Sequence, residues 1–307
     1  MARATRSKAH LSETLTTRGA EAIATGPLGA LSHDELGVVF NGLADPLQPV
    51  VAVALSSTCL GLRTPLRAAL EVLKERHARA AALCRKVSTA VYPCSCAVLR
   101  VAEKLDWANR GLTAHHMATL GMILRTNGLP QLQMLRLFNN SFGTAGMQAL
   151  CEGLERGPVS ALCVLALVSN QFGPAGAETL AAALRRGAMP KLEKLNLNSN
   201  PALGNPGVAA LATALRKLPA LSGLFLHNCG IGDEGVASLV ANLGKDDFKA
   251  LAQLNLSCNH LTNTGCATLV TAIKAGALPS LKDVSLCGQG CEAANESVRA
   301  ALAARSQ

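Results

Sequence analysis

Residues 227–239, HNCGIGDEGVASL, contain the residue types from which a nucleotide-binding turn could be built. Gly230, Gly232 and Gly235 follow the spacing G-x-G-x-x-G, after an alternating apolar run and before a helix-like stretch. Glycines at this spacing let backbone N–H groups approach a pyrophosphate at a helix N-terminus. Such a site also needs an acidic residue at the end of the next strand. That strand, LNLSC, offers Ser257 instead, so we expect no nucleotide or other cofactor.

Cysteine and histidine are the other residue types that could bind a metal or act in catalysis. The closest cysteine pairs, Cys94-x-Cys96 and Cys287-x3-Cys291, have no second pair at zinc-finger spacing. The eleven cysteines are scattered and odd in number, which favours free reduced thiols in a cytoplasmic or nuclear protein. No cysteine–histidine or carboxylate pair near His227 is arranged for acid–base chemistry. The sequence predicts neither a metal site nor an enzyme.

The composition favours thin, stacked units over one core built around aromatic residues. The 307 residues are 49% hydrophobic and only 3% aromatic. No apolar run approaches the roughly 18 residues that cross a bilayer, so we expect no membrane contact. The net charge of +9 is spread along the chain except on one expected helix. Its basic residues are Arg63, Arg67, Lys74, Arg76, Arg79, Arg85 and Lys86. We expect a solvated helix face rather than a nucleic-acid site, because no aromatic residues interleave with them.

A segment that recurs every 29 or 30 residues determines the architecture. It begins at Leu105, Leu135, Leu165, Leu195, Leu224, Leu254 and Val284. The five middle copies read L-x-L-x-x-N/C, followed by a bulky apolar residue, a short link and a glycine. The alternating leucines predict a short strand, and an asparagine such as Asn140 can bond backbone groups where the chain turns. Gly232 and Gly235 recur in register in other copies, which identifies them as turn residues.

These units resemble leucine-rich repeats of the ribonuclease-inhibitor type, over about residues 98–291. The resemblance implies an α/β leucine-rich repeat solenoid, with parallel strands on the concave face and helices on the convex face. We assign it residues 98–307, closed by a C-terminal capping helix. Trp107, Arg110, His116 and Gln289 depart from the pattern in the first and last copies, as terminal capping repeats commonly do.

The concave face is the predicted binding surface. An apolar group at the second and third repeats is followed along the stack by an asparagine, histidine and lysine patch, and such apolar groups with polar rims often bind proteins. The predicted protein-binding residues are Met134, Arg136, Phe138, Val168, Asn198, Phe225 and His227. Two alternatives are intramolecular cover by a loop or the N-terminal region, and no role at all.

Two further regions precede the repeats. Residues 1–28 are polar and read as a disordered arm, with an organellar transit peptide as the alternative. Residues 29–92 predict a small all-α unit, with an amphipathic helix from about Pro65 to Val87. Part of this unit resembles an F-box. The matching residues are Asp34, Glu35, Leu36, Phe40, Leu43, Pro46, Leu47 and Cys59, whereas Ser32 and Leu62 depart from the pattern.

The F-box resemblance implies that Leu36, Phe40, Leu43 and Pro46 dock on a Skp-type adaptor of a cullin ubiquitin ligase, with the target protein on the concave face. The alternative is a scaffold or sensor without a ubiquitin link, in which the N-terminal helices only cap the repeats. A third reading is a GTPase-activating protein resembling the Ran activator, although this chain ends in ALAARSQ rather than an acidic tail. Ribonuclease inhibition is disfavoured, because a chain of charge +9 would repel a basic ribonuclease.

Overall fold

The computed structural model describes residues 36, 39–40, 44–57, 66–126, 129–156, 159–244, 246–288 and 292–304. The chain divides into two compact units, Met1–Ala81 and Ala82–Gln307. Some predicted features lie outside the described residues: the arm at 1–28, Leu43, Cys59 and Gln289. Among the described helices, none is both long and apolar enough to span a membrane.

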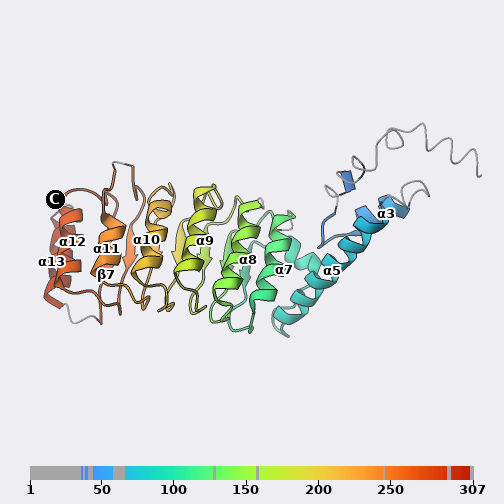
Figure 1. The fold of residues 1–307 in the computed structure, drawn as a ribbon, viewed down its shortest axis with the longest axis horizontal. Helices are drawn as coiled ribbons and strands as arrows, with labels where there is room; N and C mark the ends of the chain where they lie inside the picture. Colours follow the sequence, from blue (N-terminus) through green and yellow to red (C-terminus); the bar gives the residue numbers. More distant parts are fainter. Residues whose placement is uncertain are drawn as a thin grey trace, which may run out of the picture. The chain divides into compact units, whose positions relative to one another are not determined.

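The second unit is a regular alternation of strands and helices. Its strands are β1 (Lys104–Asp106), β2 (Met134–Arg136), β3 (Val164–Ala166), β4 (Lys194–Asn196), β5 (Gly223–Phe225), β6 (Gln253–Asn255) and β7 (Asp283–Ser285). Its helices are α6 (Cys96–Arg100), α7 (Ala114–Arg125), α8 (Gly143–Arg156), α9 (Pro174–Arg185), α10 (Gly204–Leu215), α11 (Asp233–Val240), α12 (Asn263–Lys274) and α13 (Glu292–Ala303). Helices α7 to α13 follow one another in chain order along the unit (Figure 1).

All seven strands form one parallel sheet in the order β1 to β7. The repeat is kept in register, since Leu105 pairs with Leu135 and Leu135 with Leu165. These central leucines are buried, and each fully buried leucine stabilises the fold by about 1.5–3 kcal/mol. The residues on either side of them point to the opposite face of the sheet, because strand side chains alternate. The predicted leucine-rich repeat solenoid is confirmed.

Buried asparagines connect one repeat to the next, at Asn140, Asn170, Asn200 and Asn259. The Oδ1 of Asn140 accepts bonds from the backbone N–H groups of Arg110 (3.0 Å) and Leu112 (3.1 Å) in the preceding repeat. Its Nδ2 donates to backbone carbonyls of the same and preceding repeats. In the fifth repeat Cys229 replaces the asparagine, and its thiol donates to Leu197 O at 3.2 Å. The predicted backbone bonding of the repeat asparagine is confirmed.

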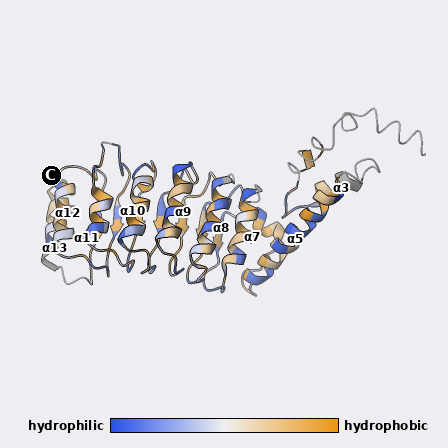
Figure 2. Cartoon of the chain, in the orientation of Figure 1, coloured by the Kyte–Doolittle hydropathy of each residue, from blue (hydrophilic) through white to orange (hydrophobic). Residues whose placement is uncertain are grey.

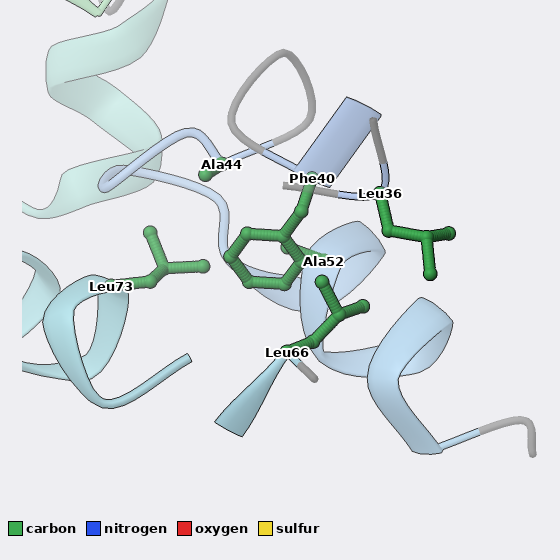
Figure 3. Close-up of a cluster of buried hydrophobic side chains, with 6 residues drawn as sticks. All are labelled: Leu36, Phe40, Ala44, Ala52, Leu66 and Leu73. Carbon is green, nitrogen blue, oxygen red and sulfur yellow. The ribbon is translucent and has the colours of Figure 1, made fainter. Parts of the chain in front are cut away.

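The first unit contains α3 (Val50–Ser57) and the first part of α5 (Arg67–Val87). Its buried side chains form a cluster of Leu36, Phe40, Ala44, Ala52, Leu66 and Leu73, shown in Figure 3. The Nδ1 atom of His77 on α5 lies 2.7 Å from the backbone oxygen of Pro46, which joins the helix to the 44–49 segment. These elements agree with a helical unit at this end of the chain.

Helix α5 is amphipathic, and it carries both hydrophilic and hydrophobic residues along its length (Figure 2). Leu73, Ala80 and Leu83 are buried at helical spacing. The basic residues of the same helix are exposed or half-buried, at Arg67, Lys74, Arg76, Arg79, Arg85 and Lys86. This arrangement fits the predicted solvated face.

Candidate protein-binding face

The candidate site is the surface of the sheet opposite the helices. In β2, β4 and β6 the central leucine is buried and both neighbours retain exposure. The parallel register aligns the outward-facing residues of all seven strands in columns. We call this surface the strand face, and it includes all the predicted binding residues: Met134, Arg136, Phe138, Val168, Asn198, Phe225 and His227. All seven side chains are half-buried, so each keeps area for a partner.

The apolar part of the strand face lies on β2 and β3. Met134 pairs in register with Val164, and the outward side chains of both are half-buried. Phe138 and Val168 follow their strands at equivalent positions, and the adjacent Asn139 N–H donates to Val168 O at 2.9 Å. Ala166 between them is 3% exposed and adds little contact area. The predicted apolar group is therefore contiguous across two neighbouring repeats.

Phe225 adds an aromatic side chain to the strand face at β5. A Cβ atom at Gly223 would lie 2.9 Å from Cε2 of Phe225 and 3.5 Å from Cγ of Lys194. Because Gly223 has no side chain, the Phe225 ring can lie over it, next to the aliphatic part of Lys194. Any larger residue at position 223 would displace this ring. The sequence did not reveal this role of the glycine.

Polar groups on the strand face are partly fixed by the backbone. The Oδ1 of Asn198 accepts a bond from the backbone N–H of His227 at 2.8 Å, and this bond orients the amide. Arg136 lies 3.4 Å from Asp106, and the two side chains are 42% and 56% exposed. An exposed pair of this kind contributes little stability, so either charge can turn to a partner at small cost. The face thus combines apolar contact area with oriented hydrogen-bonding groups.

A cavity of about 630 Å³ lies beside β1, at the end of the sheet where no further strand pairs among the described residues. Its walls come from segment 87–102 and from β1 and the residues that follow it, including Tyr92, Cys94, Val98, Lys104 and Trp107. Tyr92 and Val98 are 74% and 53% exposed. Sequence reasoning missed this cavity, because segment 87–102 lies before the recognisable repeats.

In the glycine-rich segment 230–235, the backbone N–H groups that a phosphate would need already bond to another side chain. Gly230 has φ of +69° and its Cβ would lie 2.4 Å from the Pro201 carbonyl oxygen, so the turn requires glycine there. The Oδ1 of Asn205 accepts bonds from the N–H groups of Gly232 (2.6 Å) and Gly235 (3.2 Å). A phosphate would need these donors, and they are occupied. Gly230 and Gly232 lie in the turn before α11, as predicted, whereas Gly235 lies within the first turn of that helix.

Within the part of the chain that the structure describes, no group of three or more His, Cys, Asp and Glu side chains is placed to hold a metal ion. Burial raises the pKa of the Cys151 thiol to about 12 and that of Cys229 to about 11, so both stay protonated at neutral pH. Neither is a ready nucleophile, since the thiolate is the reactive form.

The residues expected to dock on an adaptor are differently placed. Phe40 is fully buried, Leu36 is 7% exposed, and Pro46 is also buried. Leu43 lies outside the described residues. In this structure the three described side chains therefore belong to the interior of the first unit and do not form an exposed surface. The accessible apolar side chains of this unit include Val50 and Val51 on α3, which are 66% and 50% exposed.

Comparison with known proteins agrees with the repeat geometry. The Leucine Rich repeat family matches residues 188–212 and 251–270. A ribonuclease inhibitor of Sus scrofa is 28% identical over 192 residues, which cover 62% of this chain and 34% of the inhibitor. A ribonuclease inhibitor of Mus musculus is 32% identical over 198 residues, covering 62% of this chain and 41% of the inhibitor. A Tonsoku-like protein of Bos taurus is 30% identical over 174 residues, which are 56% of this chain and 10% of that protein.

The chain thus spans 34% and 41% of the length of the two inhibitors. Together with the seven-stranded parallel sheet, the matches show leucine-rich repeats similar to those of ribonuclease inhibitors.

Proposed function

We propose that this leucine-rich repeat protein binds a protein partner through its strand face and is not itself a catalyst. The observation that carries the proposal is the contiguous group of half-exposed apolar side chains on β2 and β3 and directly after them, bordered by oriented polar groups. Aromatic and methionine side chains grouped in this way are typical of the centre of protein interfaces. The similarity to ribonuclease inhibitors supports a role in binding.

The test compares protein capture by the wild type and two aspartate variants. Phe138→Asp places a charge at the centre of the apolar group, whereas Ala145→Asp places the same charge on an exposed position of α8. Proteins captured from the source cells are identified, and each is then purified and titrated against the three chains. We expect Phe138→Asp to weaken binding more than about tenfold and Ala145→Asp to leave it unchanged. Equal affinity for all three chains would refute the assignment of the strand face.

A ribonuclease is one partner class to test, since two of the relatives are named ribonuclease inhibitors. The charge of this chain does not complement a basic enzyme. The net charge is +9, and the strand face exposes Lys104 and Lys194. Like charges oppose association. We therefore expect no inhibition of a basic ribonuclease at physiological salt, and nanomolar inhibition would overturn this expectation.

A narrower proposal is that the partner is a target of a cullin ubiquitin ligase and that the first unit recruits a Skp-type adaptor. It rests on the F-box-like residues of the sequence. Because Leu36 and Phe40 are buried, their alanine variants would test folding rather than docking. The exposed Val51 on α3 offers a cleaner test: purified adaptor is mixed with the wild type and with Val51→Asp. Capture by the wild type alone would support the proposal, and no capture by a folded wild type would leave the scaffold alternative.

A further inference from the structure

The second repeat shows which backbone groups of a strand bond to the repeat before it. The N–H groups of Gln133 and Met134 both donate to Glu103 O, at 2.8 and 3.0 Å. Further along, Arg136 O accepts a bond from the Trp107 N–H at 2.9 Å. The third repeat bonds to the second through the equivalent groups. Each strand thus offers two donors at its start and an acceptor at its end to the repeat that precedes it.

The equivalent groups of the first repeat lie on the open edge of β1. They are the N–H groups of Glu103 and Lys104 and the carbonyl oxygen of Asp106. Because β1 and β2 pair in register, these groups point away from β2, just as their equivalents in the second repeat point away from β3. Among the described residues β1 pairs with β2 alone, and no backbone group bonds to this edge. Unpaired groups on a strand edge are a template for a further strand.

Arg110 is a second sign that a preceding segment can bind. It occupies the position of the ladder asparagine in the first repeat. In the second repeat the Nδ2 of that asparagine, Asn140, donates to the preceding backbone oxygen, that of Trp107, at 2.9 Å. Arg110 lines the cavity beside β1, and its Nε is buried without a hydrogen-bond partner among the described residues. A buried donor without an acceptor is costly, and a carbonyl group placed in the cavity would satisfy it.

The cavity beside β1 has the size and lining of a peptide site. Its volume of about 630 Å³ lies within the range of about 300–1,000 Å³ found for ligand pockets. Its apolar lining includes Tyr92 and Val98, which remain 74% and 53% exposed, and exposed apolar groups of this kind mark interaction sites. Among its charged lining residues Lys104 and Arg110 are basic and Asp106 is acidic. This surplus of positive charge favours an acidic ligand.

We propose that the edge of β1 binds an extended, acidic and apolar peptide segment of a partner protein as a further parallel strand. Backbone bonds provide the affinity in such strand addition, and pockets for alternate side chains provide the specificity. The peptide takes the place of a repeat before the first, so its positions one to seven are the equivalents of residues 103–109. This site is the edge of the sheet and is separate from the strand face.

The register assigns a partner to each part of the peptide. The carbonyl of position one accepts bonds from the N–H groups of Glu103 and Lys104, and the N–H of position five donates to Asp106 O. The carbonyl of position five accepts a bond from Arg110, in the way that a preceding carbonyl accepts one from the ladder asparagine. Because strand side chains alternate, positions three and five point inward and take apolar residues. Position two points outward beside Lys104 and takes the acidic residue.

The test uses the full chain and heptapeptides that are acetylated at the N-terminus and amidated at the C-terminus. Their sequence is Thr-Glu-X-Thr-X-Thr-Ser, in which each X is Val, Ile, Leu or Phe. Binding is followed by the fluorescence of Trp107, which is the single tryptophan and lines the cavity. We expect saturable binding of at least one peptide below about 1 mM, with slower hydrogen exchange at the Glu103 and Lys104 amides. The proposal is overturned if no peptide changes either signal.

Methylation of peptide nitrogens distinguishes edge pairing from unspecific apolar contact. A methyl group on the nitrogen of position five removes the donor to Asp106 O, so we expect binding to weaken about tenfold. The same group at position four should leave the affinity unchanged, because the N–H of that position points away from β1. Any other order of the two affinities would overturn the parallel pairing.

Two arginine variants test the donor in the cavity. Arg110→Ala should weaken peptide binding about tenfold, and the matched Arg125→Ala, at an exposed position of α7, should leave it unchanged. Equal affinity of both variants would overturn the role of Arg110. The methylated peptides act on the wild type and decide the pairing even if a variant fails to fold. Phe138→Asp should bind the peptide normally, so this proposal and that for the strand face are tested separately.

Discussion

Replacing one asparagine of the buried ladder tests the physical basis of the repeat stack. Asn170 is fully buried and sits between the second and third repeats. Its Oδ1 accepts a bond from the Asn140 N–H at 3.1 Å. Its Nδ2 donates to Leu137 O at 2.8 Å and to Val168 O at 3.1 Å. In Asn170→Ala all three bonds are lost, but the two carbonyls keep other donors, from Asn140 Nδ2 and the Asn139 N–H.

The expected loss follows from these contacts. One buried N–H group left without a partner costs about 1–3 kcal/mol, and each of the two other bonds contributes about 0.5–1.5 kcal/mol. We therefore expect Asn170→Ala to lower the free energy of unfolding by about 2–6 kcal/mol. The stack should lose stability as a whole, because each repeat is stabilised by its neighbours.

Urea unfolding provides the measurement, with far-UV circular dichroism for the stack and the fluorescence of Trp107 for the first repeat. Trp107 is the single tryptophan of the chain and is 4% exposed. The matched control is Asn263→Ala, since Asn263 is exposed at the start of α12. The reasoning would be refuted if the two variants differed by less than about 0.5 kcal/mol, which is the range of ordinary surface substitutions.

Three further predictions use the same unfolding assay. Cys229→Asn should raise stability by about 1 kcal/mol, because asparagine restores ladder bonds that one thiol donor cannot make. Gly153→Ala should lower it by about 3 kcal/mol, because the added Cβ would lie 2.3 Å from Gly121 Cα between α7 and α8. Asp247→Asn should destabilise at pH 7, and this effect should shrink as the pH falls below the ordinary pKa of an aspartate. Lys217, 2.6 Å away, lowers the pKa of the buried Asp247, and the resulting stabilisation is lost as this carboxylate is protonated.

Each of these predictions has a matched control. Cys229→Ala should be less stable than the wild type. Stability should therefore fall in the order Asn, Cys, Ala for the residue at position 229. Gly244→Ala should change the free energy of unfolding much less than Gly153→Ala does, because its Cβ would meet no atom closer than 3.7 Å. Asp246→Asn should show no comparable pH dependence, because Asp246 is 80% exposed whereas Asp247 is 4% exposed. A reversal of any of these orders would contradict the corresponding contact.

Much of the strand face could be predicted, because its residues are fixed by periodicity. Once Leu135 and Leu165 are assigned to buried strand positions, alternation alone places Met134 and Arg136 on the opposite face. The apolar group of Phe138 and Val168 follows from the constant 30-residue offset. The packing of Phe225 over Gly223 could not be predicted, since the direction of a half-exposed ring depends on its neighbours.

The F-box-like pattern does not distinguish a docking surface from a core. A match at Leu36, Phe40 and Pro46 identifies apolar side chains at helical or turn positions, but the same residue types serve equally well as a core. Leu36 and Phe40 are buried in one cluster with Leu66 and Leu73, which lie 26 to 37 residues further along the chain.

The sequence by itself determined the repeat, the parallel strands, the buried leucines and the asparagine ladder. Each of these features depends on local periodicity, and identical units can bury their apolar residues only by stacking. The tertiary structure alone decided which distant groups meet: Gly121 with Gly153, and Cys84 with Cys96. These contacts join residues that no periodic pattern relates, because they depend on how helices and loops pack after the stack has formed.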